Sequence, residues 1–158
     1  GSFDKGIENL KKLNYFDLIK RRVEIEKIPI LGICLGMQLL TKGSDEGELK
    51  GLNFIDAYAS KFEFPYKSKL KIPHMGWNVT TKEKESLIFN DNNEEMRFYY
   101  VHSYAIQCND ISDILTTCNY GYKFVSSFEK NNIIGAQFHP EKSHKFGISF
   151  FKNFVENY

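Results

Sequence analysis

The chain has 158 residues, of which 42% are hydrophobic, enough to build one domain with a buried core. Its 21 basic and 20 acidic residues leave a net charge of +1, so the composition gives no reason to expect a nucleic acid or a membrane surface as partner. No apolar run approaches the about 20 residues that cross a bilayer, and no signal peptide is visible.

The cysteines point to a reducing compartment. Cys34, Cys108 and Cys118 are odd in number and far apart, which fits neither a disulfide framework nor a zinc-binding CxxC pair. We therefore expect a cytoplasmic protein without a metal site. Cys108 and Cys118 have apolar neighbours, and we interpret them as ordinary, partly buried thiols.

The first 43 residues predict helices around one strand. Apolar residues recur at helical spacing over 7–19, with a break at Asn14 that predicts two short helices. The run 28–34 is apolar on both faces, as in a buried strand of a parallel sheet. A helix that stops near Gly43 follows directly, so strand, Cys34 and helix form one unit.

From about residue 50 the pattern predicts strands. Short β-branched and aromatic runs, separated by turn signals, lie at 54–64, 96–108, 114–121, 123–129 and 132–140. Residues 130–132 predict a hairpin turn. The end of the chain returns to helix, with one face formed by Phe150, Phe151, Phe154 and Val155. Only one clear parallel strand is present, so either the sheet is mostly antiparallel or further strands precede residue 1.

"GICLGMQLL", residues 32–40, places Cys34 between two glycines at the predicted corner between strand and helix. A helix N-terminus favours the thiolate, the nucleophilic form of cysteine. Gly32 and Gly36 permit a strained corner and close approach of a backbone or substrate. The backbone N–H of Leu35 would point at an oxyanion on an attacked carbonyl. The alternative is a buried structural cysteine in a glycine-flanked turn.

"AQFHPEKS", residues 136–143, supplies a base for such a thiol. His139 ends a predicted strand, Pro140 is expected to force an extended turn, and Glu141 is expected to point back along the same side. A thiolate needs an imidazole to take and return a proton and a third group to orient the imidazole. The residues therefore predict thiolate chemistry on a carbonyl, without separating an amidase, a protease and a glutaminase.

Together, "GICLGMQLL" and "GAQFHPEKS" resemble the class I glutamine amidotransferases, whose triad is Cys-His-Glu in that chain order. "PHMGWN" at 73–78 and "FYYVHSYA" at 98–105 narrow the resemblance to the glutaminase subunits of imidazole glycerol phosphate synthases. The resemblance covers residues 1–158 as one domain. It implies an α/β fold, a flavodoxin-like three-layer arrangement of a mixed sheet with helices on both faces, here without its N-terminal strands.

The same resemblance implies an activity and a partner. L-glutamine would be hydrolysed to glutamate and ammonia through a cysteinyl thioester, without a metal or organic cofactor. The ammonia would pass to a (β/α)₈-barrel cyclase subunit in a heterodimer of histidine biosynthesis. Residue by residue, it makes Cys34 the nucleophile, His139 the general acid and base, and Glu141 the carboxylate that orients His139.

The resemblance also implies substrate contacts. Leu35 corresponds to a backbone donor of the oxyanion hole and Gln38 to a glutamine that contacts the substrate. Ser103 and Tyr104 match the segment whose backbone holds the α-amino and α-carboxylate groups of the substrate. In the family, a further segment ends in a Pro-Gly-x-Gly loop that helps build the oxyanion hole. Gly1 would belong to the tail of that loop, unless Gly1 and the next residue remain from tag cleavage.

Met75, Trp77 and Lys142 match family positions that face the synthase partner. For Trp77 the alternative is a place in the core. Of the remaining histidines, we interpret His102 as structural and leave His74 and His144 unassigned.

Two other functions stay open from the sequence. A paralogous glutaminase and cyclase pair serves the amidation of surface sugars in some bacteria, and the motifs do not separate it from the histidine pathway. The second alternative is a truncated, inactive subunit that serves only for docking.

Overall fold

The computed structural model describes residues 2–89 and 95–158. The N-terminal part contains α1 (Phe3–Lys12), α2 (Tyr15–Lys20) with a π-helical turn to Ile25, β1 (Ile30–Ile33) and α3 (Leu35–Leu39). Asn14 separates α1 from α2 in the left-handed conformation, with φ 59°. The predicted helix break at this residue is thus confirmed.

The rest of the described chain is mainly β-structure closed by one helix. The elements are β2 (Ala57–Lys61), β3 (His74–Lys82), β4 (Met96–His102), β5 (Tyr104–Cys108), β6 (Ile114–Tyr120), β7 (Tyr122–Lys130), β8 (Ile133–Ala136) and α4 (His144–Asn157). Short 3₁₀ turns cover Leu87–Phe89, Ile111–Asp113 and Pro140–Lys142. The predicted hairpin turn between β7 and β8 is confirmed, with Asn131 at φ 54°.

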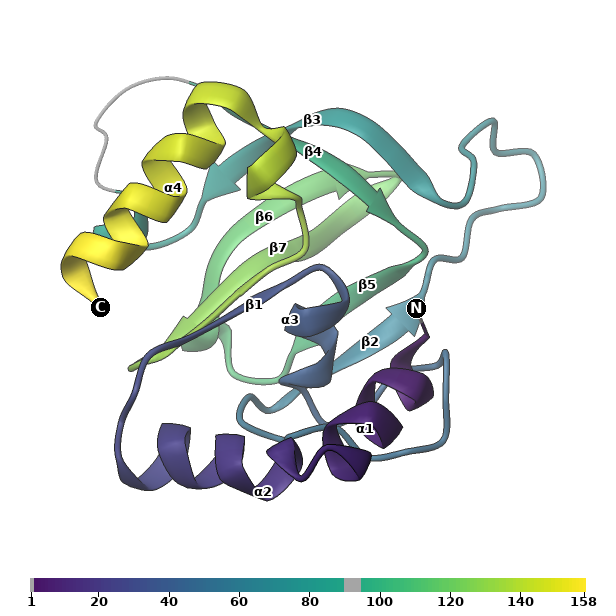
Figure 1. Cartoon of the computed structure of the whole chain (residues 1–158). Helices are drawn as coiled ribbons and strands as arrows, with labels where there is room; N and C mark the ends of the chain where they lie inside the picture. Colours follow the sequence, from purple (N-terminus) through teal and green to yellow (C-terminus); the bar gives the residue numbers. More distant parts are fainter. Residues whose placement is uncertain (1, 90–94) are drawn as a thin grey trace.

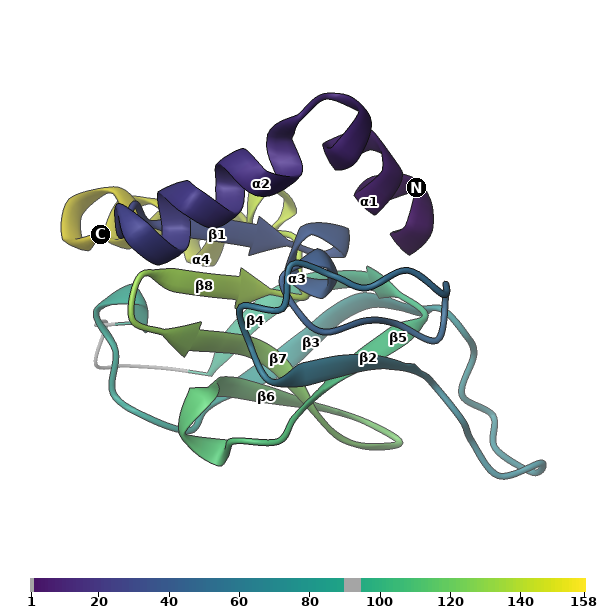
Figure 2. The same cartoon turned by 90° about the horizontal axis from the view of Figure 1, so that it is seen from below.

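The strands form one curled, mixed sheet in the order β1-β8-β7-β6-β3-β4, and β5 joins it through β7 and carries β2 on its other side. Among the described strands only β1 and β8 pair in parallel, and the other pairs are antiparallel (Figure 2). Within the described residues the sheet is therefore mostly antiparallel.

Helices cover the two faces of this sheet. In Figure 1 the strands lie between α4 and the pair α1 and α2. One core packs Phe150 of α4 against Phe98 and Phe138. The other packs Met37 of α3 against Phe128. The predicted α/β class with a mixed sheet is confirmed.

Two strands and one residue of α4 differ from the sequence prediction. β1 is not a buried inner strand, because it lies at one end of the sheet order and only Gly32 is buried in it. Val155 lies outside the apolar face of α4 and is 80% exposed. The strand β3 was missed, since Pro73 and Gly76 weaken the strand signal. Pro73 directly precedes β3, and Gly76 lies within it at φ 124°.

The helix after Cys34 is also shorter than predicted and ends at Leu39 rather than near Gly43. The backbone N–H groups of Leu52 and Phe54 donate to the carbonyl oxygens of Leu39 and Leu40, at 2.8 and 2.9 Å. These bonds with a distant segment satisfy groups at the helix end, so the helix stops early.

The glycines of the corner provide a stability test. A Cβ on Gly32 would lie 2.7 Å from the backbone of Gly36 and from the side chain of Leu40, whereas a Cβ on Gly36 meets nothing within 4 Å. Gly32→Ala should lower the free energy of unfolding by about 1–3 kcal/mol through overpacking. Gly36→Ala, the matched control inside α3, should leave it unchanged or raise it by about 0.5–1 kcal/mol. Urea unfolding measures both, and equal losses would contradict this packing.

Candidate active site

The parallel pair β1–β8 brings the two halves of the predicted site together. Ile33 is in register with Ala136, and the N–H of Cys34 donates to the carbonyl oxygen of Ala136 at 2.7 Å. Carboxyl ends of parallel strands meet at one edge of a sheet. Cys34 and the segment that leads to His139 therefore emerge side by side, although they are 105 residues apart in sequence.

Cys34 occupies a strained corner, as the sequence predicted. Its backbone has φ 51° and ψ −110°, which is unusual for a residue with a Cβ. It directly precedes α3, and Gly32 allows the backbone of α3 to approach β1 closely. The corner thus holds the thiol at the end of β1, on the residue that directly precedes α3.

The sequence predicted a thiolate at Cys34, but the site without substrate favours the thiol. Burial raises the pKa of the Cys34 thiol, the N–H of Leu35 opposes this shift, and the charge of Glu141 adds to it. The desolvation of the sulfur outweighs the backbone donor at the start of α3, a helix of five residues. Cys34 is therefore a thiol that needs a base.

Gln137 and the backbone hold this thiol in place. The side-chain Nε2 of Gln137 donates to Cys34 Sγ at 3.6 Å, and Sγ lies 3.9 Å from the carbonyl oxygen of Val101. Gln38 donates to the side-chain oxygen of Gln137 at 3.1 Å. Sequence reasoning missed Gln137. Its position two residues before His139, on the same side of an extended chain, is the signal that could have found it.

His139 and Glu141 form the predicted pair. His139 Nδ1 and Glu141 Oε1 are 2.6 Å apart. Pro140 opens a 3₁₀ turn rather than the extended turn expected, and this turn brings the two side chains together. His139 Nε2 is buried and has no hydrogen-bond partner among the described residues. The histidine is oriented on one side and free on the other, and it does not bond the thiol in this structure.

The predicted nucleophile and four of the predicted substrate contacts lie around one cavity of about 240 Å³. Its lining residues are Cys34, Leu35, Gln38, Glu46, Pro73, Val101, His102, Ser103 and Tyr104. Cys34, Leu35, Gln38, Ser103 and Tyr104 were expected there, whereas His139 and Glu141 do not line it. Gly1 lies outside the described residues. Sequence reasoning missed Glu46, whose loop position carries no motif, and Pro73.

The three residues assigned to a partner interface are exposed. Met75 is 62% exposed and Trp77 47%, so Trp77 is not a core residue. The Trp77 ring stacks on His144, with centroids 5.4 Å apart and planes at 8°. The Lys142 ammonium lies over the Tyr99 ring, 5.6 Å from its centroid. Together these five side chains offer an aromatic and cationic surface beside the segment that carries His139.

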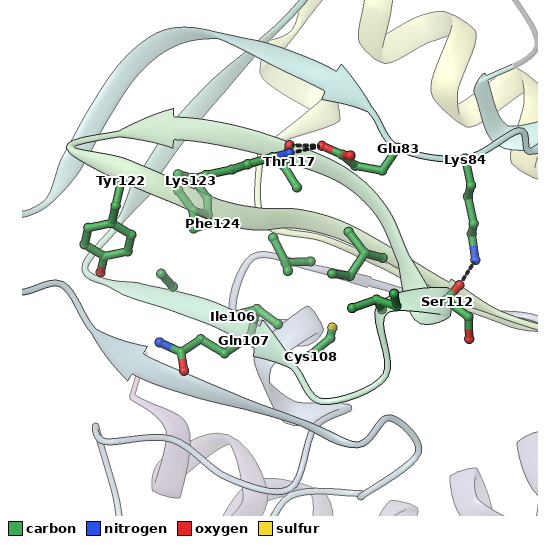
Figure 3. Close-up of a pocket in the computed structure, with 14 residues that line it drawn as sticks. Glu83, Lys84, Ile106, Gln107, Cys108, Ser112, Thr117, Tyr122, Lys123 and Phe124 are labelled. Carbon is green, nitrogen blue, oxygen red and sulfur yellow. Dashed lines mark hydrogen bonds and ion pairs between the residues drawn. The ribbon is translucent and has the colours of Figure 1, made fainter.

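A larger cavity of about 770 Å³ lies elsewhere, between β5 and the pair β6 and β7 (Figure 3). Its lining is mainly apolar, and none of the predicted site residues lines it. Burial raises the pKa of Cys108, which lines this cavity, to about 12, so this thiol is no nucleophile near neutral pH. The candidate site is therefore the smaller cavity, which Cys34 and the other predicted substrate contacts line.

No group of three or more His, Cys, Asp or Glu side chains among the described residues could hold a metal ion. None of the helices described is long and apolar enough to span a membrane.

Comparison with known proteins identifies the family. The sequence model of "Glutamine amidotransferase class-I" matches residues 6–158. The chain belongs to this family. Two crystal structures of glutamine amidotransferases have the same fold. One matches with a TM-score of 0.66 at 14% identity, covering 93% of this chain and 69% of its own. The other, from Thermotoga maritima, has a TM-score of 0.60 at 22% identity and covers 94% and 57%.

Closer relatives carry a more specific name. "Imidazole glycerol phosphate synthase subunit HisH 2" of Methanococcus maripaludis is 50% identical over 156 residues, which are 99% of this chain and 76% of the relative. The protein of the same name from Pseudomonas aeruginosa is 46% identical over the same shares. Subunit HisH 1 of Campylobacter jejuni is 43% identical, over 98% of this chain and 76% of its own.

The raised pKa of Cys34 predicts the pH dependence of its alkylation. Without substrate, the rate of carbamidomethylation at Cys34 should still rise above pH 9, because a thiol whose pKa is raised by burial is still incompletely ionised there. Peptide mass spectrometry localises the label and separates Cys34 from the other two cysteines. A rate that levels off near pH 7 would mean that the helix N-terminus outweighs burial.

Proposed function

We propose that the chain is the glutaminase subunit of an imidazole glycerol phosphate synthase, which hydrolyses L-glutamine to glutamate and ammonia. The observation that carries this proposal is the cavity that joins the Cys34 corner, Gln38 and the Ser103–Tyr104 corner, with the His139–Glu141 pair on the adjoining strand end. Membership of the class-I family and the relatives named HisH support the assignment.

The reaction follows from the thiol and its base. His139 Nε2 takes the proton of the Cys34 thiol, and the sulfur attacks the side-chain amide carbon of glutamine. The N–H of Leu35 stabilises the oxyanion that forms. The imidazolium then gives its proton to the leaving nitrogen, so ammonia departs and a γ-glutamyl thioester remains on Cys34. A water molecule, deprotonated by His139, hydrolyses the thioester to glutamate and restores the thiol.

The cavity also offers groups for the amino-acid end of glutamine. Glu46 is half-buried in the lining and supplies a negative charge for the α-ammonium group. Backbone groups of Ser103 and Tyr104 lie at the same wall and suit the α-amino and α-carboxylate groups. Gln38 fixes Gln137, which holds the sulfur. The pocket therefore selects a zwitterion whose amide reaches Cys34.

The exposed surface of Met75, Trp77 and Lys142 is the proposed docking site of a (β/α)₈-barrel cyclase subunit. Aromatic side chains are enriched at protein interfaces and often act as anchors there. Lys142 directly follows Glu141, so the ammonia would leave the site beside this surface. The complex would be a cytoplasmic heterodimer that passes ammonia into imidazole glycerol phosphate synthesis for histidine.

Substitution of the triad tests the enzyme proposal in the full-length protein with its cyclase. Cys34→Ala should abolish glutamine hydrolysis and leave cyclase binding intact. His139→Asn should cost about 10²–10⁴-fold in rate, the usual share of a general acid and base. Glu141→Gln should cost less, because it orients the imidazole without exchanging the proton. If Cys34→Ala keeps substantial hydrolysis, or Glu141→Gln is worse than His139→Asn, the assigned roles are wrong.

Substitution of Trp77 tests the docking surface. Trp77→Ala should weaken association with the cyclase by about 2 kcal/mol or more, about thirtyfold in affinity. The fold of the free subunit should change little, because the side chain is half exposed. Tyr15→Ala, which removes an equally exposed ring on α2, is the control and should bind as the wild type does. Calorimetric titration and thermal melts measure both properties. A lower melting temperature with unchanged affinity would place Trp77 in the core instead.

A further inference from the structure

Two buried histidines outside the triad form a pair next to the candidate site. His74 of β3 and His102 of β4 are partners in the sheet register. Their side chains are 2% and 5% exposed, and His74 Nδ1 lies 3.0 Å from His102 Nε2. A contact between two buried imidazole nitrogens requires one donor and one acceptor. Neither histidine has a part in the reaction above.

The neighbouring groups decide which nitrogen carries each proton. The side-chain oxygen of Asn78 accepts from the next backbone N–H at 2.8 Å, so its Nδ2 donates, to Asn119 O at 3.0 Å and to His74 Nε2 at 3.2 Å. His74 Nε2 is then an acceptor, and His74 Nδ1–H donates to His102 Nε2. His102 in turn donates from Nδ1 to the carbonyl oxygen of Tyr104 at 2.7 Å. Every nitrogen of the pair has one partner.

Both rings are uncharged near neutral pH. Burial lowers the pKa of His74 to about 4 and that of His102 to about 3. The rings of Tyr100 and Tyr120 stack on His74, with centroids 4.8 and 4.1 Å away. The Phe124 ring lies 5.2 Å from His102. The hydrogen bonds that run from Asn78 through His74 and His102 to Tyr104 form a relay. A further proton on either ring would place two N–H donors opposite each other, so this relay holds only while both rings are neutral.

The relay ends on the wall of the cavity. The bond from His102 to Tyr104 spans Ser103, the single residue between β4 and β5. The carbonyl oxygen of Ser103 accepts from the N–H of Phe62 at 3.0 Å, which holds the corner from the other side. His102, Ser103 and Tyr104 all line the cavity at Cys34. The shape of this wall therefore depends on the orientation of the His102 ring.

We propose that His74 is a positioning residue for substrate binding: it orients His102 and so fixes the Ser103–Tyr104 corner against which glutamine binds. This inference rests on the proposed glutaminase function. The chemistry at Cys34 does not involve His74, so loss of the relay should weaken binding and leave the bond-making steps in place. The kinetic signature is a higher KM for glutamine at nearly constant kcat.

Two variants of the full-length protein separate the relay from simple packing. His74→Leu fills space but cannot donate, whereas the Nδ2 of an asparagine in His74→Asn takes the place of the lost Nδ1–H donor. His74→Leu should raise KM about tenfold, which corresponds to the free energy of about one lost hydrogen bond. His74→Asn should restore KM to near the wild-type value. Thermal melts verify that both variants are folded.

Nitrogen-15 NMR of labelled histidine tests the relay independently of activity. The wild type should show two neutral rings protonated at Nδ1 that do not titrate between pH 6 and 8, and His74→Leu should shift the His102 signals. The relay would be overturned if the rings of His74 and His102 were protonated at Nε2 or titrated in this range. Equal KM values in both variants, or a loss confined to kcat, would overturn the positioning role. If the wild type binds and hydrolyses no glutamine while the NMR pattern holds, the proposed function fails and the positioning role fails with it.

Discussion

The parallel pairing of β1 with β8 is the constraint on which the site depends. It is the parallel strand pair among the described strands, and it places Cys34 beside Ala136 through a hydrogen bond of 2.7 Å. Beyond this pair the two segments diverge: β1 leads into α3, and β8 leads to Gln137 and His139. Shifting this register by one residue would turn the side chains of β8 to the opposite face and separate the sulfur from Gln137.

The electrostatics of the site explain why several groups must act together. Burial keeps Cys34 in the thiol form, and Glu141 adds a negative charge nearby that also disfavours the thiolate. The same Glu141 orients His139, whose Nε2 is buried without a partner among the described residues. The proposed nucleophile and base are thus both held in place without being bonded to each other. In the proposed mechanism, proton transfer between them requires a closer arrangement than this structure shows.

Local patterns in the sequence were sufficient for most of the fold. Helical spacing and the break at Asn14 predicted α1 and α2, and the aromatic runs predicted most of the strands. The strand β3 was missed because Pro73 and Gly76 are signals of a break, and tertiary pairing with β4 and β6 overrides them. The early end of α3 could not be predicted, since it depends on hydrogen bonds from Leu52 and Phe54, which lie beyond the local sequence.

The candidate site likewise contains residues that local motifs predict and residues that only the folded chain brings together. Cys34, His139 and Glu141 stand in short motifs whose chemistry is readable from residue type and order. Glu46 reaches the cavity from an irregular loop, and its proposed role follows only from the folded chain. The raised pKa of Cys34 was not predicted either, because the sequence shows the start of a helix but neither its shortness nor the burial of the sulfur.

The central claim is that Cys34 attacks the amide carbon of glutamine within this cavity. The most direct test is to treat the full-length protein, bound to the proposed cyclase subunit, with a diazoketone analogue of glutamine and to measure its mass intact and after digestion. The account predicts one equivalent of label, confined to Cys34 and prevented by excess glutamine. Label spread over Cys108 and Cys118, or labelling of Cys34 that glutamine does not prevent, would contradict it.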